Sequence, residues 1–367
     1  MTALHAADFG IVGDGVTDST NGFLALHAHL LTDRERMWQV TFPPGHYLTR
    51  ASHWLINVGR VTLIGYGASL QHMVANKGLF SPSVVFRHLV SREPFPAPQV
   101  FEHHPGFRIR TVEAGSFEVE FLSGVTPAEV APGAIALIAG YNQQTTNEDP
   151  PRSAGWPPNH RFAEFVEIQE VGAGFVRLLR PLRHDYDEAW PDYDGDYFGP
   201  IRFGAPRLFL ANRPGFDIPR HIEMRGFRFL RSIGATSVNG VGFPCALTLV
   251  LEDCVIQETD PVSTSFVQIA DRVVLRRCAF DGLEVDKNLR HVLLDDCDIG
   301  EAGLTSDGAG CEILELRNTR LHSLCRINPR TVIVENVSAQ RNFHLNAAHG
   351  GYYDSTPFTV TTRATRP

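Results

Sequence analysis

The sequence has few of the features that mark basic, membrane-spanning or metal-binding proteins. Lysine and arginine total 33 against 41 aspartates and glutamates, which gives a net charge of −8. This balance argues against nucleic acid or an anionic membrane as the main partner. No run of apolar residues is long enough to cross a bilayer. The six cysteines lack the paired spacing of metal ligands. We therefore expect no metal ion and no cofactor.

The N-terminus also lacks the marks of a secretory signal. It reads Met-Thr-Ala-Leu-His-Ala-Ala, with neither a basic segment nor an apolar one. A cytoplasmic location is the default expectation, and a secreted protein is expected if a signal segment has been removed. The remaining composition, 43% hydrophobic and 20% charged, is that of a globular protein.

One short apolar pattern recurs six times between Ile222 and Ala339, at intervals of 27, 24, 19, 22 and 18 residues. Such a period predicts a β-solenoid whose turns stack on one another. Stacking the units predicts three inward files: Ile222, Leu249, Val273, Val292, Leu314, Val332; Met224, Leu251, Leu275, Leu294, Leu316, Val334; and Phe227, Cys254, Cys278, Cys297, Thr319, Val337. The cysteines of the third file are expected to be buried structural thiols. An outward file alternates in charge: Arg225, Glu252, Arg276, Asp295, Arg317, Glu335.

The N-terminal segment shows a second pattern. Asp8-Phe-Gly, Gly13-Asp-Gly and Thr17-Asp18 precede a predicted helix over 20–31, and Phe42-Pro-Pro-Gly45 with Tyr47 follows it. This segment resembles the opening of the pectate-lyase-3-like superfamily, which includes polygalacturonase-like enzymes. The resemblance implies a right-handed parallel β-helix and carries no chemistry. Together, the two patterns predict an all-β fold: a right-handed parallel β-helix (solenoid) with an N-terminal capping helix and an inserted small β domain.

The polygalacturonase-like catalytic motifs are not carried over. Asp281-Gly282 and Asp295-Asp296-Cys297 look like two of them. However, stacking the repeats places Asp295 and Asp296 in the charge ladder, so we predict a structural role for this pair.

Residues 100–183 interrupt the repeat with short strands between glycine- and proline-rich turns. We therefore expect a cap and first turns over 1–99, an inserted β-rich domain with an acidic, aromatic loop over 100–200, a main β-helix over 201–345 and a C-terminal tail over 346–367.

The candidate catalytic residues are Glu284, Asp286 and Asp307, on the second strand of successive turns. By strand geometry Glu284 and Asp286 are about 6.5–7 Å apart, and Asp286 and Asp307 about 5 Å. The first spacing suits an inverting glycosidase and the second a retaining one. The same surface offers substrate-binding candidates, with Gln268 aligned beside Glu284: Gln268, Lys287, Arg326 and His344. A plain polar outer surface of a solenoid is the alternative.

The stretch 184–197 is dense in carboxylates and aromatics. We expect Asp185, Tyr186, Trp190 and Tyr193 to contact a sugar as part of a lid, because aromatic faces beside acids suit sugar rings. The alternatives are a solvated loop and a calcium loop over 192–196, although the latter lacks the twelfth-position glutamate.

These patterns favour a carbohydrate-active enzyme, a glycoside hydrolase that cleaves an oligo- or polysaccharide. One alternative is a polysaccharide lyase, in which Arg326 or Lys287 neutralises a uronate. Another is a non-catalytic glycan-binding or tailspike-like module. A homo-oligomer is compatible with the sequence.

Overall fold

The computed structural model describes residues 1–51, 55, 58–74, 106–141, 161–190, 205–210, 212–213, 216–217, 220–230, 233, 239–242, 246–257, 264–267, 270–286, 289–307, 311–323, 325–327, 329, 331–339, 343–345 and 359–362. The chain forms two compact units. The first comprises Met1–Pro82, Ile218–His349 and Tyr353–Pro367, and the second comprises Ser83–Asp217 with Gly350–Tyr352. The insertion that we expected over 100–200 corresponds to this second unit.

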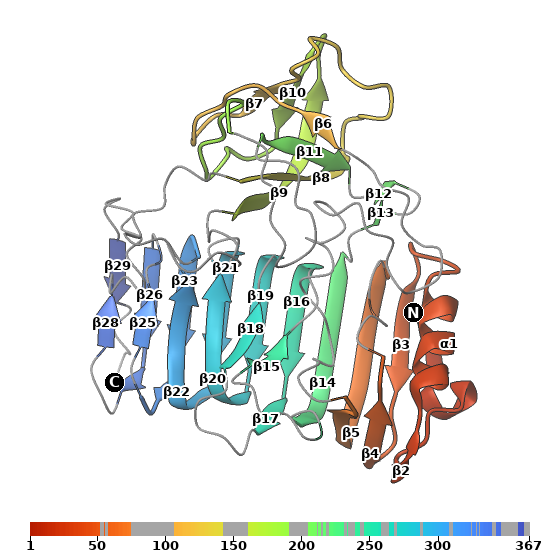
Figure 1. The fold of residues 1–367 in the computed structure, drawn as a ribbon. Coiled ribbons are helices and arrows are strands. Elements are labelled where there is room, and N and C mark those ends of the chain that lie inside the picture. Colours follow the sequence, from red (N-terminus) through yellow and green to blue (C-terminus); the bar gives the residue numbers. More distant parts are fainter. Residues whose placement is uncertain are drawn as a thin grey trace. The chain divides into compact units, whose positions relative to one another are not determined.

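The first unit is a parallel β-helix in which most turns contribute strands to three faces (Figure 1). The first face consists of β1 (Thr2–His5), β3 (Met37–Thr41), the start of β5 (Arg60–His72), the start of β14 (His221–Leu230), β16 (Ala246–Glu252), β19 (Ala270–Arg276), β21 (Leu289–Asp295), β23 (Ile313–Arg317), β26 (Thr331–Glu335) and β29 (Thr359–Thr362). The predicted right-handed parallel β-helix is confirmed.

The second face consists of β2 (Asp14–Asp18), β4 (Gly45–Thr49), the ends of β5 and β14, β17 (Val255–Gln257), the starts of β20 (Ala279–Asp286) and β22 (Asp298–Asp307), β24 (Arg320–Leu321) and β27 (Ser338–Ala339). The third face consists of β15 (Asn239–Gly242), β18 (Thr264–Val267), the ends of β20 and β22, β25 (Cys325–Ile327) and β28 (Phe343–Leu345).

The predicted register of the first face is confirmed at each of the six repeats. Ile222 pairs with Leu249, and the same column continues to Val332. The residues of this column are at most 1% exposed. The charge column also pairs as predicted, from Arg225 opposite Glu252 to Arg317 opposite Glu335. The alternation of the sequence therefore sets the packing of this face.

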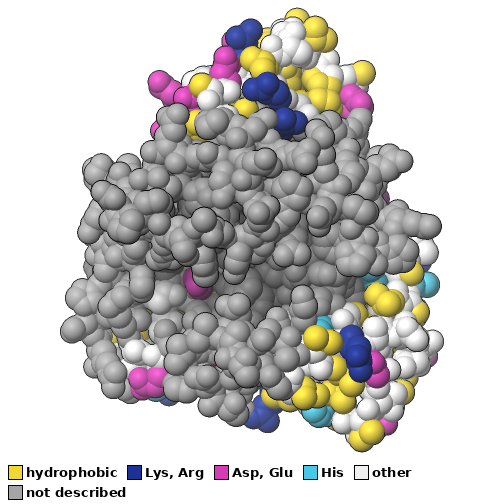
Figure 2. All heavy atoms as spheres, viewed as in Figure 1, with side chains coloured by type: hydrophobic (Ala, Val, Ile, Leu, Met, Phe, Trp, Pro, Cys, Tyr) yellow, Lys and Arg dark blue, Asp and Glu magenta, His cyan; other side chains and the backbone are white. Residues whose placement is uncertain are grey.

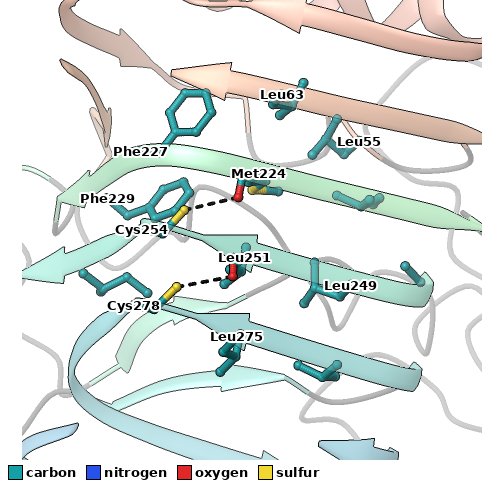
Figure 3. Packing of buried hydrophobic residues seen from close by; sticks show 14 of the residues in the cluster. Leu55, Leu63, Met224, Phe227, Phe229, Leu249, Leu251, Cys254, Leu275 and Cys278 are labelled. Atoms are coloured by element: carbon teal, nitrogen blue, oxygen red, sulfur yellow. Dashed lines mark hydrogen bonds between the residues drawn. The ribbon is translucent and has the colours of Figure 1, made fainter. Parts of the chain in front are cut away.

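The third inward file lies at the bend between the first and second faces. The thiols of Cys254, Cys278 and Cys297 are buried, and each donates a hydrogen bond of 3.4 Å to a backbone carbonyl of the preceding turn. Figure 3 shows this contact for Cys254 and Cys278. Phe227 continues the file and packs its ring against Phe229, with 5.8 Å between the ring centroids. These cysteines act as small apolar core residues, as predicted.

A column of left-handed residues turns the chain between the first and second faces. It consists of Gly226, Asp253, Arg277, Asp296, Asn318 and Asn336, with φ between 47° and 74°. Asparagine, aspartate and glycine adopt this conformation most readily, which explains their predominance here. Figure 1 shows the turns stacked along the axis of the unit.

The N-terminal cap contains η1 (Ala6–Phe9) and α1 (Thr20–Leu30). The helix buries Phe23, Leu26 and Leu30 in the same apolar core as the β-helix. Its N-cap residue is Ser19, but the Ser19 hydroxyl accepts a hydrogen bond from the Val12 N–H at 2.9 Å rather than from the helix. At this end of the unit exposed apolar side chains lie beside charged ones (Figure 2).

Two sequence alignments need correction. The sequence placed Gln268 beside Glu284, whereas Phe266 is the backbone partner of Glu284 and Val267 pairs with Val285. The shift arises because Ala270 already belongs to the first face, where it is buried opposite Ala246 and Leu289. In addition, the expected tail contains β29, which pairs with β26 in parallel and adds a further strand to the first face.

The second unit contains an antiparallel sheet in the order β6 (Phe107–Arg108), β11 (Arg207–Leu210), β8 (Ile135–Tyr141), β9 (Arg161–Val171), β10 (Phe175–Leu178) and β7 (Glu118–Glu120). A short hairpin joins β12 (Asn212–Arg213) to β13 (Phe216–Asp217). The core of the second unit includes Ile109, Phe121, Ile138 and Leu208, all at most 1% exposed. Among the described residues, no helix has the length and hydropathy of a membrane span.

Candidate functional site

The predicted catalytic residues lie on two adjacent strands of the third face. Leu283 and Val285 in β20 are at most 1% exposed, and Glu284 between them is partly exposed. Glu284 therefore faces outward, as strand alternation requires. Its backbone partner on β22 is Thr305, and Asp286 is the direct partner of Asp307. The register thus brings three carboxylate positions together on neighbouring strands.

The column of Glu284 and Thr305 continues along the axis. Thr305 pairs with Arg326, and Arg326 pairs with His344. Glu284, Thr305, Arg326 and His344 therefore occupy one column on four successive turns. Gln268 and Lys287 lie outside the described residues, so their predicted roles stay predictions.

A histidine and a carboxylate of the second face were missed by the sequence reasoning. Nε2 of His322 lies 2.6 Å from Oδ1 of Asp298, which projects outward from β22 on the second face. Both side chains are partly exposed, 32% for His322 and 46% for Asp298. A carboxylate that holds an imidazole in one orientation is a common arrangement for proton transfer. Stacking the repeats one column beyond the cysteine file aligns Asp298 with Arg320, two residues before His322.

A close backbone approach shapes the bend between the second and third faces. The register between β20 and β22 shifts after Phe280 and Ile299, so that Gly282 pairs with Gly303. A Cβ atom on Gly300 would lie 3.2 Å from both the Cα and the carbonyl oxygen of Asp281. Glycine at 300 therefore lets this bend lie close to the preceding turn beside Asp281.

Charge changes sign between two consecutive stretches of the sequence. Residues 298–316 contain five carboxylates and no lysine, arginine or histidine: Asp298, Glu301, Asp307, Glu312 and Glu315. Residues 320–334 contain no carboxylate and four basic or imidazole side chains: Arg320, His322, Arg326 and Arg330.

The structure corrects the interpretation of the acidic, aromatic stretch. Tyr186 is 1% exposed and Trp190 is 8% exposed, and both pack in the core of the second unit. The Tyr186 hydroxyl donates a hydrogen bond of 3.2 Å to Glu164. Asp185 accepts a hydrogen bond of 2.7 Å from the Ala114 N–H. Tyr186 and Trp190 are thus core residues rather than sugar contacts, because their side chains are covered, and Asp185 fastens a loop.

Tyr193 and the candidate calcium loop over 192–196 lie outside the described residues. Within the part of the chain that is described, no three side chains of His, Cys, Asp or Glu are grouped as metal ligands.

Asp295 and Asp296 have structural surroundings. Asp296 holds a left-handed corner at φ 54°, and its N–H donates to the carbonyl of Arg317 at 2.9 Å. Asp295 accepts a hydrogen bond of 3.5 Å from the Asn318 side chain. These contacts are those expected of a ladder that joins successive turns.

Comparison with known proteins gives similarity of architecture only. No family model matches the sequence, and no curated protein matches it. The structure is similar to the tailspike protein gp49 of Pseudomonas phage LKA1, at 14% identity over 92% of this chain and 56% of that one, with a TM-score of 0.34. The gp54 tailspike of Acinetobacter baumannii bacteriophage AP22, solved in complex with A. baumannii capsular saccharide, has 9% identity, 92% and 58% coverage and a TM-score of 0.41.

The tailspike gp61 of Pseudomonas phage phi297 has 12% identity over 98% of this chain and 67% of its own length, with a TM-score of 0.43. The present chain spans 56% and 58% of the first two tailspikes.

Proposed function

We propose that this protein is a carbohydrate-active enzyme, a glycoside hydrolase that cleaves an oligo- or polysaccharide on the third face of its β-helix. The observation that carries the proposal is the direct pairing of Asp286 with Asp307, with the outward-facing Glu284 on the same strand as Asp286. Glycoside cleavage needs two carboxyl groups on either side of the bond, one as proton donor and one as nucleophile or base. A rigid sheet holds such groups at fixed spacing.

Two pairs of carboxylate positions have the spacings of the two types of glycosidase, retaining and inverting. Positions directly opposite on adjacent rungs, such as 286 and 307, are about 4.8 Å apart, which is near the spacing of a retaining enzyme. Positions two apart on one strand, such as 284 and 286, are about 6.5–7 Å apart, which leaves room for the water of an inverting enzyme. We assign the acid and base roles to Glu284, Asp286 and Asp307 on this ground.

A polysaccharide lyase is the second candidate. Arg326 occupies the same column as Glu284, on the second turn after it. A guanidinium there would neutralise a uronate carboxylate while His344 or a carboxylate removes the neighbouring proton. A non-catalytic glycan-binding module, in which the same columns bind without cleaving, is the third candidate.

The test is a depolymerisation screen with matched variants. Plant cell-wall and bacterial capsular polysaccharides are incubated with the wild type and with Glu284→Gln, Asp286→Asn and Asp307→Asn, and reducing ends and ultraviolet absorbance of unsaturated uronates are followed. Each variant is expected to lower turnover by about 10²–10⁴-fold, the usual contribution of an acid–base group. Asp295→Asn and Asp296→Asn serve as controls and should retain activity, because both residues lie in the ladder.

The outcomes separate the candidates. Reducing ends without unsaturated products support the hydrolase, and unsaturated products support the lyase. Binding without cleavage supports the non-catalytic module. Loss of activity in the Asp295 and Asp296 variants, with Glu284→Gln still active, would overturn the assignment of the site.

A further inference from the structure

An exposed tyrosine is held rigidly at the bend between the first and second faces. Tyr66 is 54% exposed. It lies in β5 between Gly65 and Gly67. The register with β14 shifts here, since Ile64 pairs with Arg225 and Ala68 pairs with Phe227. Two additional residues therefore form a bulge at this bend, and bulges of this kind redirect a side chain.

The bulge depends on its two glycines. A Cβ atom on Gly65 would lie 2.3 Å from the Phe227 ring, so a larger residue would displace core packing. Gly67 has φ +82°, a conformation that other residues rarely adopt. The local sequence Gly-Tyr-Gly is thus what allows the tyrosine to project from the bend.

One face of the ring is covered by backbone. A Cβ atom on Gly226 would lie 2.4 Å from Cδ1 and 2.6 Å from Cγ of Tyr66, so the ring packs directly on this glycine. The following turns carry Asp253, Arg277, Asp296, Asn318 and Asn336 at the same left-handed corner. Glycine at this corner therefore leaves a place that the Tyr66 ring fills.

The hydroxyl end of the ring is also fixed. It donates a hydrogen bond of 2.8 Å to Oδ2 of Asp253, on the turn after Gly226. Asp253 is in turn held by Arg277, whose Nε lies 2.7 Å from Oδ1. Arg277 also contacts Glu252 at 2.5 Å. An exposed ring that is anchored at both ends loses little further freedom when a ligand binds, which favours affinity.

We propose that Tyr66 is a stacking platform for a pyranose ring, and hence a saccharide-binding site separate from the carboxylates of the third face. The C–H bonds on one side of a pyranose are weakly positive and pack on the negative face of an aromatic ring. Arg277 and Arg225 both pair with Glu252, the residue before Asp253, and these side chains carry donors and acceptors for hydroxyl groups. The site lies at the bend between the first two faces, whereas Glu284 lies on the third. Only its ligand class rests on the proposed function.

The test measures binding of the whole chain to an array of plant cell-wall and bacterial capsular polysaccharides. Tyr66→Ala is expected to lower the affinity about tenfold, in line with the usual strength of an aromatic stacking contact. Tyr66→Phe keeps the ring on Gly226 and should stay within about threefold of the wild type. Gly226→Asn places at this corner the residue type of Asn318 and Asn336, and its side chain displaces the Tyr66 ring without removing it. Its loss of affinity should therefore be similar to that of Tyr66→Ala.

Asp296→Asn, a change at the same corner of a distant turn, is the matched control and should bind like the wild type. Thermal melting of each variant shows that the fold is retained. Unchanged binding by Tyr66→Ala and Gly226→Asn would overturn the platform and leave the proposed function standing. Equal losses in Tyr66→Phe and Tyr66→Ala would also overturn stacking, since the hydroxyl rather than the ring would then bind. A wild type that binds no polysaccharide on the array would overturn the ligand class both here and in the proposed function.

Discussion

The side-chain amide of Asn336 donates a hydrogen bond of 2.9 Å to the side-chain oxygen of Asn318, at the same left-handed corner one turn earlier. Asn318 in turn donates to Asp295 at 3.5 Å. The corner column therefore joins turns through side chains as well as through the backbone. The left-handed backbone at both positions also explains the residue type, because asparagine adopts a positive φ more readily than most residues.

Asn318→Ala should destabilise the protein by about 1–2 kcal/mol, because alanine is strained at a left-handed φ and cannot replace the amide hydrogen bonds. Asn318→Gly keeps the backbone relaxed and should cost less. Thermal or denaturant unfolding of the two variants measures the difference. Equal losses would show that the hydrogen bonds, not the backbone conformation, dominate at this corner.

Glu223 should contribute a pH-dependent part of the stability. Hydrogen bonds from His221, then Arg225 and Thr62, hold its pKa at about 2, against a usual value of 4.5. A carboxylate with a lowered pKa in the folded state stabilises the fold above its usual pKa and loses this contribution as the pH falls towards 2. A shift of this size corresponds to about 3 kcal/mol. Glu223→Gln should therefore flatten the stability profile between about pH 5 and 2.

A matched control for this prediction is Glu335→Gln, on the same face. Glu335 is 34% exposed against 14% for Glu223, and its closest arginine contact is 3.8 Å. Its removal should change the acid limb of the profile much less. Identical profiles for the two variants would contradict the role of Glu223.

The buried ion pair of the second unit should be essential to that unit. Arg183 and Glu164 are 5% and 2% exposed, with 3.6 Å between Nε and Oε2. Glu164 also accepts hydrogen bonds from the backbone of Arg183 and from the Tyr186 hydroxyl. Glu164→Ala leaves a buried cation without its carboxylate and should cost about 3–5 kcal/mol. Limited proteolysis should then cleave within Ser83–Asp217.

Tyr186→Phe tests the corrected role of Tyr186 in the same assay. It removes a single hydroxyl and should cost about 1 kcal/mol. Saccharide binding should be unchanged, because the ring is in the core. A large loss of binding with an intact fold would restore the sugar-contacting role that the sequence suggested.

The pair formed by Asp298 and His322 should act as one group in catalysis. If the 2.6 Å contact orients the imidazole, then Asp298→Asn and His322→Gln should lower turnover by similar factors, about 10²-fold or more. The double variant should be no worse than the more affected single one, since residues that act as a unit are not additive. Arg320→Gln, on the same strand as Leu321, is the control. Additive losses would separate the two residues.

Much of the β-helix could be predicted from the sequence because its first face is periodic. The column from Ile222 to Val332 follows from alternation within each strand and from repetition between turns, and a slip of one residue would expose it. The charge column and the buried cysteines follow from the same repeat. Glu284 faces outward for the same local reason, since its two neighbours are apolar.

Features at the bends could not be predicted in this way. Stacking by length placed Gln268 beside Glu284, whereas the chain bends earlier and Phe266 takes that place. The bend that brings Asp298 to His322 and the bulge that projects Tyr66 both involve extra residues, which break the period. Tyr186 and Trp190 lie in a stretch rich in carboxylates and aromatics, which suggested contact with a sugar, yet both side chains are buried in the second unit.

The parallel β-helix, the register of its first face and the outward direction of Glu284 thus follow from the sequence alone, because side-chain alternation and the distance between rungs are local properties of a strand. Which side chains meet at the bends, and which aromatic residues are exposed, depends on how distant segments stack. Tyr66 lies on Gly226 and reaches Asp253 because segments more than 150 residues apart in the chain stack there, as the 187-residue separation of the hydrogen-bonded pair shows. No pattern within either segment encodes that contact.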